Sequence, residues 1–197
     1  MNPPFFLFNG EMYDYFKHPH NDTSANERCV EIPLAVKVLA VYPSNEILEV
    51  GNVLFNYFDV PHDVVDKSPE ETGAIHQDIL SFKTEKKYSL IISISTLEHV
   101  GITDGPNSDK IRMVLDKFQS MLAPDGIIWA SMPLGYNPAI TRNAKFGVKM
   151  FDKEYFLKRT TVANDWIQCE RVDIKNISYG KPFPFGNALM VGISRKK

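Results

Sequence analysis

The feature that most limits the possible folds is an alternation of apolar runs with one helical pattern. Ile47 to Val50, His62 to Asp66 and Tyr88 to Ser95 are β-branched or apolar runs bounded by turn residues, as buried strands are. From Asp109 to Leu122 apolar residues recur at helical spacing, and Gly126 to Met132 is again strand-like. Strand, helix and strand in this order require a right-handed crossover between parallel strands. The sequence therefore predicts an α/β fold with a doubly wound, mostly parallel sheet.

The amino-terminal part of the chain has the pattern of an aromatic arm followed by a helix. Residues 1–22 are dense in Phe, Tyr, His and Asn without a clear period, which predicts an arm that packs over another part of the molecule. Ser24 and Glu27 match the capping box of a helix start. We expect the helix to end before Pro43 and to be broken or kinked at Pro33. Its expected buried positions are Cys29, Val30, Ile32, Val36, Leu39 and Ala40.

The carboxyl-terminal third shows weaker patterns. A short helix is expected at Asp152 to Lys158, followed by strands at Trp166 to Ile174 and Ala188 to Ser194. Because the Pro- and Gly-rich loop from Tyr179 to Gly186 separates these two strands, we predict a C-terminal antiparallel hairpin that closes the sheet edge.

The length of 197 residues fits a single domain, residues 1–197. Within it we expect an arm and leading helix that act as a lid (1–43), a cofactor-binding core (44–135), and an acceptor-side loop with the closing hairpin (136–197). Lys and Arg number 22 against 24 Asp and Glu, and a net charge of −2 disfavours nucleic-acid binding. No apolar run approaches the roughly 20 residues that span a bilayer. Together with the absence of a basic leader, this predicts a cytoplasmic protein without membrane contact, whose oligomeric state the sequence leaves open.

Small and polar residues follow successive strands of the predicted sheet. Gly51 and Asn52 follow the first strand, Asp66 ends the second, and Ser95 to His99 follow the fourth. Ligands of open α/β sheets bind beyond the carboxyl ends of the strands, so these residues are the first candidates for a site. A glycine at such a position permits close approach of a ligand, and a carboxylate can accept both hydroxyls of a ribose.

Three stretches of this series resemble the class I S-adenosylmethionine-dependent methyltransferases, over Ile47 to Leu134. Glu49-Val50-Gly51 is similar to the opening of the family's glycine loop. The stretch YSLIISISTLEHV, which begins at Tyr88, is similar to the family's fourth strand and the turn after it. The stretch LAPDGIIWASMP, which begins at Leu122, is similar to the fifth strand and the turn before it. The resemblance implies a Rossmann-like methyltransferase fold with S-adenosylmethionine as the cofactor. It further implies that Glu49, Gly51 and Asn52 line the methionine part, that Asp66 holds the ribose, that Asp78 and Ile79 meet the adenine, and that Ser95 and Thr96 complete the cofactor site.

The glycine loop departs from the family pattern. Val53 and Phe55 stand where the family repeats glycine, and only eleven residues, 52–62, separate Gly51 from the second strand. The loop must therefore be reshaped, with room for little more than a turn of the usual first helix. Two of the cofactor residues also have simpler interpretations: Asp66 as the cap of the turn at Lys67 to Pro69, and Asp78 as an N-cap.

Glu98 and His99 are the candidates for chemistry. A histidine titrates near neutrality and can accept a proton from an attacking hydroxyl, although a histidine bonded to backbone at a helix start fits equally well. We expect Glu98 to position His99 or backbone. Some methyltransferases pair such a Glu-His with a carboxylate three residues earlier to bind a divalent ion. Since Ser95 stands there, we expect no metal.

Tyr136 and Asn137 follow the fifth strand, where an acceptor would enter, and offer hydrogen bonds to a polar substrate unless they are ordinary turn residues. In the arm, Tyr13 is a further candidate for the substrate site, and Tyr15, His18, His20 and Asn21 are candidates for the lid. Arg28 is expected to pair with Glu31 on the same helix rather than to bind a ligand.

These patterns together predict methyl transfer from S-adenosylmethionine to an oxygen, or with less support a nitrogen, of a small polar acceptor such as a sugar or metabolite. The alternative is a non-catalytic binding module that keeps the fold with a degenerate cofactor loop. A nicotinamide-dependent oxidoreductase is a third interpretation, but the sequence lacks the full GxGxxG fingerprint.

Overall fold

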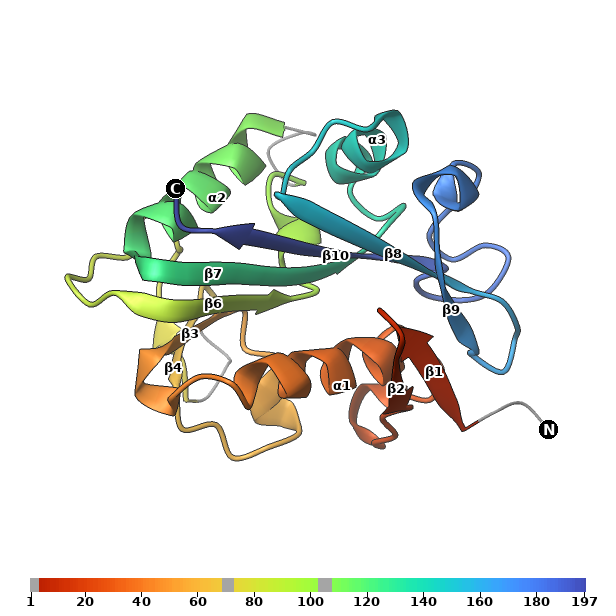
Figure 1. The fold of residues 1–197 in the computed structure, drawn as a ribbon, viewed down its shortest axis with the longest axis horizontal. Helices are drawn as coiled ribbons and strands as arrows, with labels where there is room; N and C mark the ends of the chain where they lie inside the picture. The colour runs from red at the N-terminus through yellow and green to blue at the C-terminus, as the bar shows by residue number, and fades with distance from the viewer. Residues whose placement is uncertain (1–3, 69–72, 103–107) are drawn as a thin grey trace.

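The computed structural model describes residues 4–68, 73–102 and 108–197, which build an eight-stranded sheet between helices and a separate two-stranded hairpin (Figure 1). The strands are β1 (Phe5–Phe8), β2 (Glu11–Asp14), β3 (Ile47–Val50), β4 (Asp63–Asp66), β5 (Ile75–His76), β6 (Tyr88–Ile94), β7 (Leu122–Pro133), β8 (Lys153–Arg159), β9 (Trp166–Cys169) and β10 (Ala188–Arg195). The helices are α1 (Arg28–Leu39), α2 (Ser108–Met121) and α3 (Pro138–Phe146), with short 3₁₀ segments at His20–Asp22, Ser44–Glu46, Leu54–Asn56, Leu97–His99 and Arg171–Ile174.

The sheet has the strand order β5-β4-β3-β6-β7-β10-β8-β9. The first five strands of this order are parallel, whereas β10 is antiparallel to both β7 and β8, and β8 is antiparallel to β9. This confirms the expected doubly wound, mostly parallel sheet with an antiparallel hairpin in its C-terminal part. The carboxyl ends of the five parallel strands share one edge of the sheet, which is where ligands of such folds bind.

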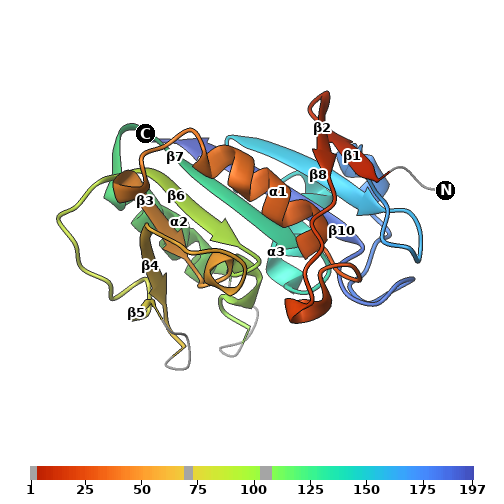
Figure 2. The same ribbon diagram turned by 90° about the horizontal axis from the view of Figure 1, so that it is seen from below.

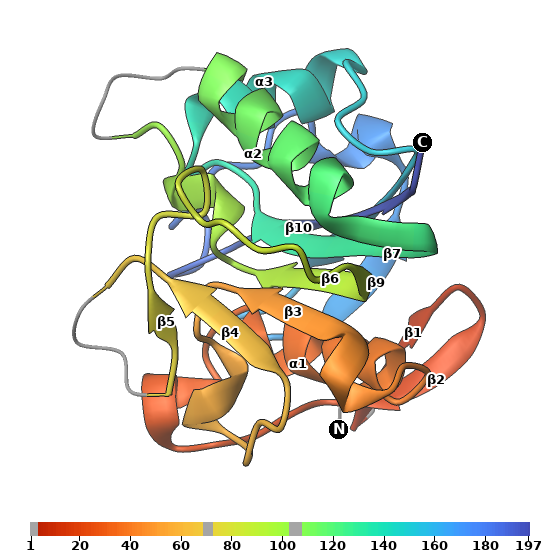
Figure 3. The ribbon, with the colours of Figure 1, turned by 90° about the vertical axis from the view of Figure 1, so that its left-hand side faces the viewer.

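Each face of the sheet is covered by helices and carries its own apolar cluster. In the view of Figure 1, α2 and α3 lie above the sheet and α1 lies below it, and Figure 3 shows the same layers from the side. The expected amphipathic helix is confirmed as α2, because Ile111, Val114, Phe118 and Met121 are all buried against the sheet. On the other face, α1 packs with Ile92 and Trp129 and with the hairpin residue Phe6.

Helix α1 begins and continues differently from the sequence expectation. The capping box is wrong: Ser24 donates to Asp22, and the Glu27 side chain makes no cap bond, while Asn26 Oδ1 accepts from Arg28 N at 2.9 Å. Pro33 lies inside a continuous helix. Its missing N–H leaves the Cys29 carbonyl without the usual helical donor. Phe16 N of the arm donates to that carbonyl at 2.9 Å, so the proline fixes the arm to the helix.

The buried face of α1 is also shifted from the expected one. Val36 is 41% exposed and Ala40 is exposed, whereas Glu31, Leu34 and Ala35 are buried. The buried glutamate was not expected on an apolar face, and its contacts are described with the site below.

The helix expected at Asp152 to Lys158 is wrong, because this segment is strand β8. It lies between β10 and β9 and pairs with both, and its neighbouring residues Phe156 and Leu157 enter the apolar clusters on opposite faces of the sheet. A strand buried on both faces has no alternation of apolar and polar residues, which is why the sequence pattern did not reveal it.

Because β8 lies between β10 and β9, the late strands at Trp166 and Ala188 do not pair with each other. The antiparallel hairpin is formed by β8 and β9, and residues 171–174 form a 3₁₀ segment instead of strand.

The first part of the arm is the β1–β2 hairpin, which packs beside β9 (Figure 2). Asn9 and Gly10 form its turn with φ values of 51° and 80°, the left-handed pair that Asn-Gly favours in tight hairpins. Tyr13, expected at the substrate site, instead stacks on Phe6 and donates from its hydroxyl to Glu11. None of the hairpin residues is among those that line the cavity described below.

The second part of the arm packs on the segment after β3. The rings of Phe16, His18 and His20 lie 5.2, 5.3 and 5.8 Å from the ring of Tyr57. Tyr15 hydrogen-bonds through its hydroxyl to the backbone of Trp166. Thus the arm joins α1, β9 and the loop after β3.

One buried guanidinium ties the arm to two loops of the carboxyl-terminal part. Arg159 Nη1 donates to the carbonyls of Ala25 and Pro184, both at 2.9 Å, while its other nitrogens donate to Thr161 and Val162 at 3.0 and 2.9 Å. Because four carbonyls share one cation, the three segments are held together by a single side chain.

We expect Arg159→Ala to lower the free energy of unfolding by about 3 kcal/mol, because four backbone carbonyls lose a charged donor. Urea denaturation measures this loss. Arg142→Ala, at an exposed arginine of α3, is the control and should change stability by less than about 0.5 kcal/mol. Equal effects in the two variants would contradict the role assigned to Arg159.

Candidate functional site

A cavity of about 650 Å³ lies at the carboxyl ends of β3, β4, β5 and β6. Its position is the one at which open α/β sheets bind ligands. Most of the cofactor residues expected from the sequence line it, together with His99. They are Gly51, Asn52, Asp66, Asp78, Ile79, Ser95 and Thr96, joined by Val53, Asn56, Lys67, Gln77 and Lys110, which the sequence did not single out.

Gly51 forms the floor of the cavity where β3 ends. Its φ is +91°, a value that disfavours every residue with a side chain, and a Cβ there would overlap the side chain of Thr96. Gly51 N donates to Val65 O at 3.0 Å, which keeps the loop against β4. This position therefore requires glycine for both backbone conformation and space.

Glu49 does not line the cavity, contrary to the expected contact with the cofactor. It is fully buried, and its Oε1 accepts from the backbone N–H groups of Val53 and Leu54, both at 2.9 Å, while His62 Nε2 lies 2.9 Å from its Oε2. The carboxylate thus holds the backbone of Val53, one of the two residues that replace the family's repeated glycines, and that of Leu54 beside it. The loop continues into the 3₁₀ segment Leu54–Asn56, in keeping with the short space before the second strand.

Asp66 and Asp78 line the cavity and also serve local turns. Asp66 accepts from Ser68 N at 2.7 Å, as the turn-cap interpretation requires, and from Asn52 N at 2.9 Å, which fixes the loop after β3. Asp78 accepts from Leu80 N at 2.9 Å, as the capping interpretation requires. A carboxylate has about four acceptor positions, so these bonds leave both aspartates able to accept from a ligand.

His99 stands at the mouth of the cavity in an aromatic stack. Its ring lies 4.8 Å from that of Tyr136, and the Tyr136 ring lies 5.2 Å from that of Tyr179, both edge-on. Partial burial, followed by the charges of Arg28 and Lys67, lowers the pKa of His99 below its ordinary 6.5. At neutral pH the imidazole is therefore uncharged and able to accept a proton.

Glu98 lies behind His99 and is 2% exposed. Its Oε1 is 3.9 Å from His99 Nε2, and its Oε2 has no hydrogen-bond partner among the residues that the structure describes. Burial and then the charge of Glu31 raise the pKa of Glu98 well above its ordinary range. Elsewhere in the described chain, no cluster of three or more His, Cys, Asp or Glu side chains is arranged to hold a metal ion.

A buried carboxylate on α1 joins the helix to the ends of two strands. Glu31 accepts from Ser95 Oγ at 2.9 Å to each oxygen, from Ser131 Oγ at 2.7 Å and from Arg28 Nη1 at 2.5 Å. The expected Arg28–Glu31 pair is thus confirmed, but it is part of a larger network. Ser95 has a φ of +37°, a left-handed conformation that costs about 1–3 kcal/mol for a residue other than glycine. Its two bonds to Glu31 hold it there.

Asn137 does not face a substrate, contrary to expectation. It is 2% exposed and caps α3 by accepting from Ala139 N and Ile140 N, while its amide donates to the carbonyls of Glu98 and Val100. Tyr136 is 39% exposed and does not line the cavity itself, but its ring contacts that of His99, which does. Sequence reasoning missed Tyr179, because its contact with Tyr136 joins two loops far apart in the chain.

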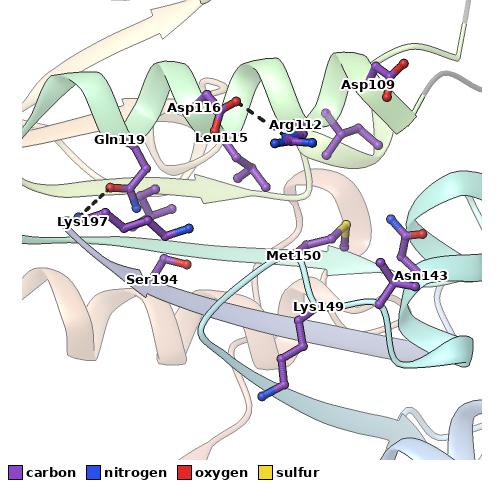
Figure 4. A pocket seen from close by; sticks show the side chains of 13 residues that line it. Asp109, Arg112, Leu115, Asp116, Gln119, Asn143, Lys149, Met150, Ser194 and Lys197 are labelled. Atoms are coloured by element: carbon purple, nitrogen blue, oxygen red, sulfur yellow. Dashed lines mark hydrogen bonds and ion pairs between the residues drawn. The ribbon is translucent and has the colours of Figure 1, made fainter.

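A second cavity of about 430 Å³ lies on the outer side of the sheet between α2, the loop after α3 and the chain end (Figure 4). Arg112 pairs with Asp116 at 4.0 Å there, and Gln119 Oε1 accepts from Lys197 N. It contains none of the residues at the carboxyl ends of the parallel strands, so the cavity at β3, β4 and β6 is the candidate site.

The fold and the position of this cavity define the class: the chain has the fold of the class I S-adenosylmethionine-dependent methyltransferases. Neither a protein-family model nor a curated protein matches the sequence. Among solved structures, the chain is similar to the N-methyltransferase NodS from Bradyrhizobium japonicum WM9 in complex with S-adenosyl-L-homocysteine, with a TM-score of 0.56 and 16% identity over 86% of this chain and 87% of that one. Another NodS structure gives a TM-score of 0.52 and 17% identity over 86% and 96%.

We expect Glu31→Gln to lower the free energy of unfolding by about 3–5 kcal/mol, since it leaves the buried Arg28 charge without its partner. Thermal or urea unfolding measures this. The control is Glu11→Gln, whose pairing with Lys37 at 3.2 Å is exposed and worth at most about 1 kcal/mol. A loss for Glu31→Gln no larger than that of the control would show that the network is not a stabilising one.

Proposed function

We propose that this protein is an S-adenosylmethionine-dependent methyltransferase that acts on an oxygen or nitrogen of a small polar acceptor. The observation that carries the proposal is the single cavity in which Gly51, Asp66 and Asp78 lie at the ends of β3, β4 and just past β5. The NodS structure with S-adenosyl-L-homocysteine supports the same ligand here, through the shared fold.

The residues present fit such a cofactor. Gly51 presents only backbone to the cavity where the methionine part would lie, and Asp66 retains acceptor positions for ribose hydroxyls. Asp78 and the half-buried Ile79 offer a polar and an apolar contact to a flat ring. Bound there, S-adenosylmethionine would supply an electrophilic methyl carbon on its sulfonium.

The chain itself would contribute position and a proton acceptor. His99 is uncharged at neutral pH and stands beside Tyr136 at the mouth, so it can take the acceptor's proton as the nucleophile attacks. Holding the nucleophile in line with the methyl carbon supplies several kcal/mol of the barrier reduction by itself.

The first test is ligand binding. Millimolar S-adenosyl-L-homocysteine should raise the melting temperature, while NAD and NADP should not, because a ligand that binds only the folded state stabilises it by mass action. Calorimetry gives the affinity. No binding of either sulfur cofactor would contradict the proposal and favour the non-catalytic module, and a selective shift with NAD would favour the oxidoreductase.

The matched variant for this test is Asp66→Asn, which removes the charge that would meet the ribose and keeps one oxygen, enough for Asn52 N or Ser68 N but not for both. We expect the affinity for S-adenosyl-L-homocysteine to fall about tenfold or more, the value of a charged hydrogen bond, and the unliganded stability to fall by about 1 kcal/mol for the lost backbone bond. Asp59→Asn, at an exposed aspartate after the loop, should leave the affinity unchanged.

The second test concerns His99. His99→Ala should lower the rate of methyl transfer by about 10²–10⁴, while the affinity for S-adenosyl-L-homocysteine stays within a few-fold. Since the pKa of His99 lies below 6.5, wild-type turnover should rise with pH through an inflection below that value and level off near neutrality. If the variant keeps the wild-type rate and the wild-type inflection, His99 is not the proton acceptor and has only a structural role.

A further inference from the structure

A buried pair of side chains lies beneath the loop that follows β3. The side chains of Glu49 and His62 are 0% and 5% exposed, and neither residue lines the cavity. Glu49 Oε1 accepts from the backbone N–H groups of Val53 and Leu54, both at 2.9 Å, and Glu49 Oε2 lies 2.9 Å from His62 Nε2. Both oxygens of this carboxylate are therefore engaged, one by the loop and the other by the imidazole.

The loop is held from beneath through its backbone. The N–H groups of residues 51–54 are all bonded within the chain. The first two donate to Val65 O at 3.0 Å and to Asp66 Oδ2 at 2.9 Å, and the last two donate to Glu49. Because residues 51–53 line the cavity, the orientation of the Glu49 carboxylate decides the shape of the wall against which a ligand would lie.

The sheet itself brings the imidazole to this carboxylate. His62 directly precedes β4, and the parallel ladder places Leu48 opposite Asp63 and Glu49 opposite Val64. A carboxylate only accepts hydrogen bonds, so His62 donates to it from Nε2. Without that donor a buried carboxylate oxygen would lose its partner, which is costly, and the carboxylate would no longer be held in the orientation that meets the two N–H groups of the loop.

We infer that His62 is a positioning residue of the cofactor site, which acts through Glu49 and does not itself contact the ligand. The inference rests on the proposed function, because it concerns the cavity in which S-adenosylmethionine would lie. The donor at Nε2 fixes the orientation of the Glu49 carboxylate, and this carboxylate fixes the backbone of Val53 and Leu54. The buried pair thus gives the loop one fixed shape, although the residues after Gly51 carry side chains.

The test compares His62→Gln with His62→Asn, which carry the same amide donor at two lengths. The amide nitrogen of Gln reaches about as far as Nε2 of histidine, whereas that of Asn reaches only about as far as Nδ1. Calorimetry should show that His62→Asn binds S-adenosyl-L-homocysteine about tenfold or more weakly than the wild type, as expected for one lost hydrogen bond to a charged group, and that His62→Gln stays within about threefold. Equal affinities in the two variants would overturn the inference.

A second buried carboxylate provides a matched control that separates affinity from stability. Glu154 Oε1 accepts from the backbone N–H groups of Met150 and Phe151 at 2.8 and 3.3 Å, and its Oε2 accepts from Arg171 Nη2 at 2.6 Å. None of these residues lines the cavity at the ends of the parallel strands. Arg171→Ala should therefore lower the melting temperature and leave the affinity for S-adenosyl-L-homocysteine unchanged. If His62→Asn behaves in the same way, its role is only structural and the inference is overturned.

The wild-type protein gives an answer even if a variant does not fold. In a long-range ¹H–¹⁵N spectrum, with His62 assigned through its own backbone, Nε2 should carry a proton because it is the donor to Glu49. A neutral ring that carries its proton on Nδ1 would overturn the inference.

The affinity of the wild-type protein for S-adenosyl-L-homocysteine separates the two proposals. If this ligand does not bind, the proposed function fails, while hydrogen exchange at Val53 and Leu54 still tests the role of His62: it should be faster than in the wild type in His62→Asn and not in His62→Gln. If the ligand binds the wild type and both His62 variants equally, only the inference about His62 fails.

Discussion

The carboxylate of Glu31 is the interaction on which the site depends. It lies on the buried face of α1 and accepts from two serines. Ser95 directly follows β6, and Ser131 lies near the end of β7. Ser95 keeps a φ of +37° through its bonds to this carboxylate and through its own N–H, which donates to Ser131 O at 2.8 Å. That conformation directs the chain from β6 into the turn that carries Thr96, Glu98 and His99. One charged group in an apolar face therefore fixes both the packing of α1 and the direction of the loop that forms the cavity wall.

A second carboxylate compensates for the altered glycine loop. Repeated glycines let a backbone approach a ligand because they lack side chains. Here only Gly51 is retained, and Glu49 holds the backbone of Val53 and Leu54 from beneath. The N–H groups that a longer helix would otherwise arrange are thus satisfied by a buried side chain. The loop that lacks the repeated glycines still lines a cavity of about 650 Å³. The change in the loop sequence therefore leaves the cavity at the ends of the parallel strands in place.

The parallel half of the fold and most cavity residues could be predicted because both follow from local signals. Buried strands, the amphipathic α2 and the polar residues at strand ends are each visible within a few positions. The predictions that were wrong concern residues whose structure depends on segments far away in the sequence. Residues 153–159 are strand only because β10 and β9 flank them. Tyr13 leaves the site because Asn9 and Gly10 turn the arm into a hairpin, a signal that was present in the sequence. Glu31 pairs with residues 64 and 100 positions away, which no local pattern reveals.

Buried polar contacts hold the loops around His99, Tyr136 and Tyr179 in place. Arg159 joins Ala25 of the arm to Pro184 of the loop that carries Tyr179, and Glu27 accepts from Gly186 of the same loop. Asn137 holds the carbonyl of Glu98 while it caps α3. Each wall of the mouth is therefore fixed by a buried polar contact to a different part of the chain. A preorganised site loses little entropy on binding, so these contacts favour a ligand that fits the cavity as the folded chain leaves it.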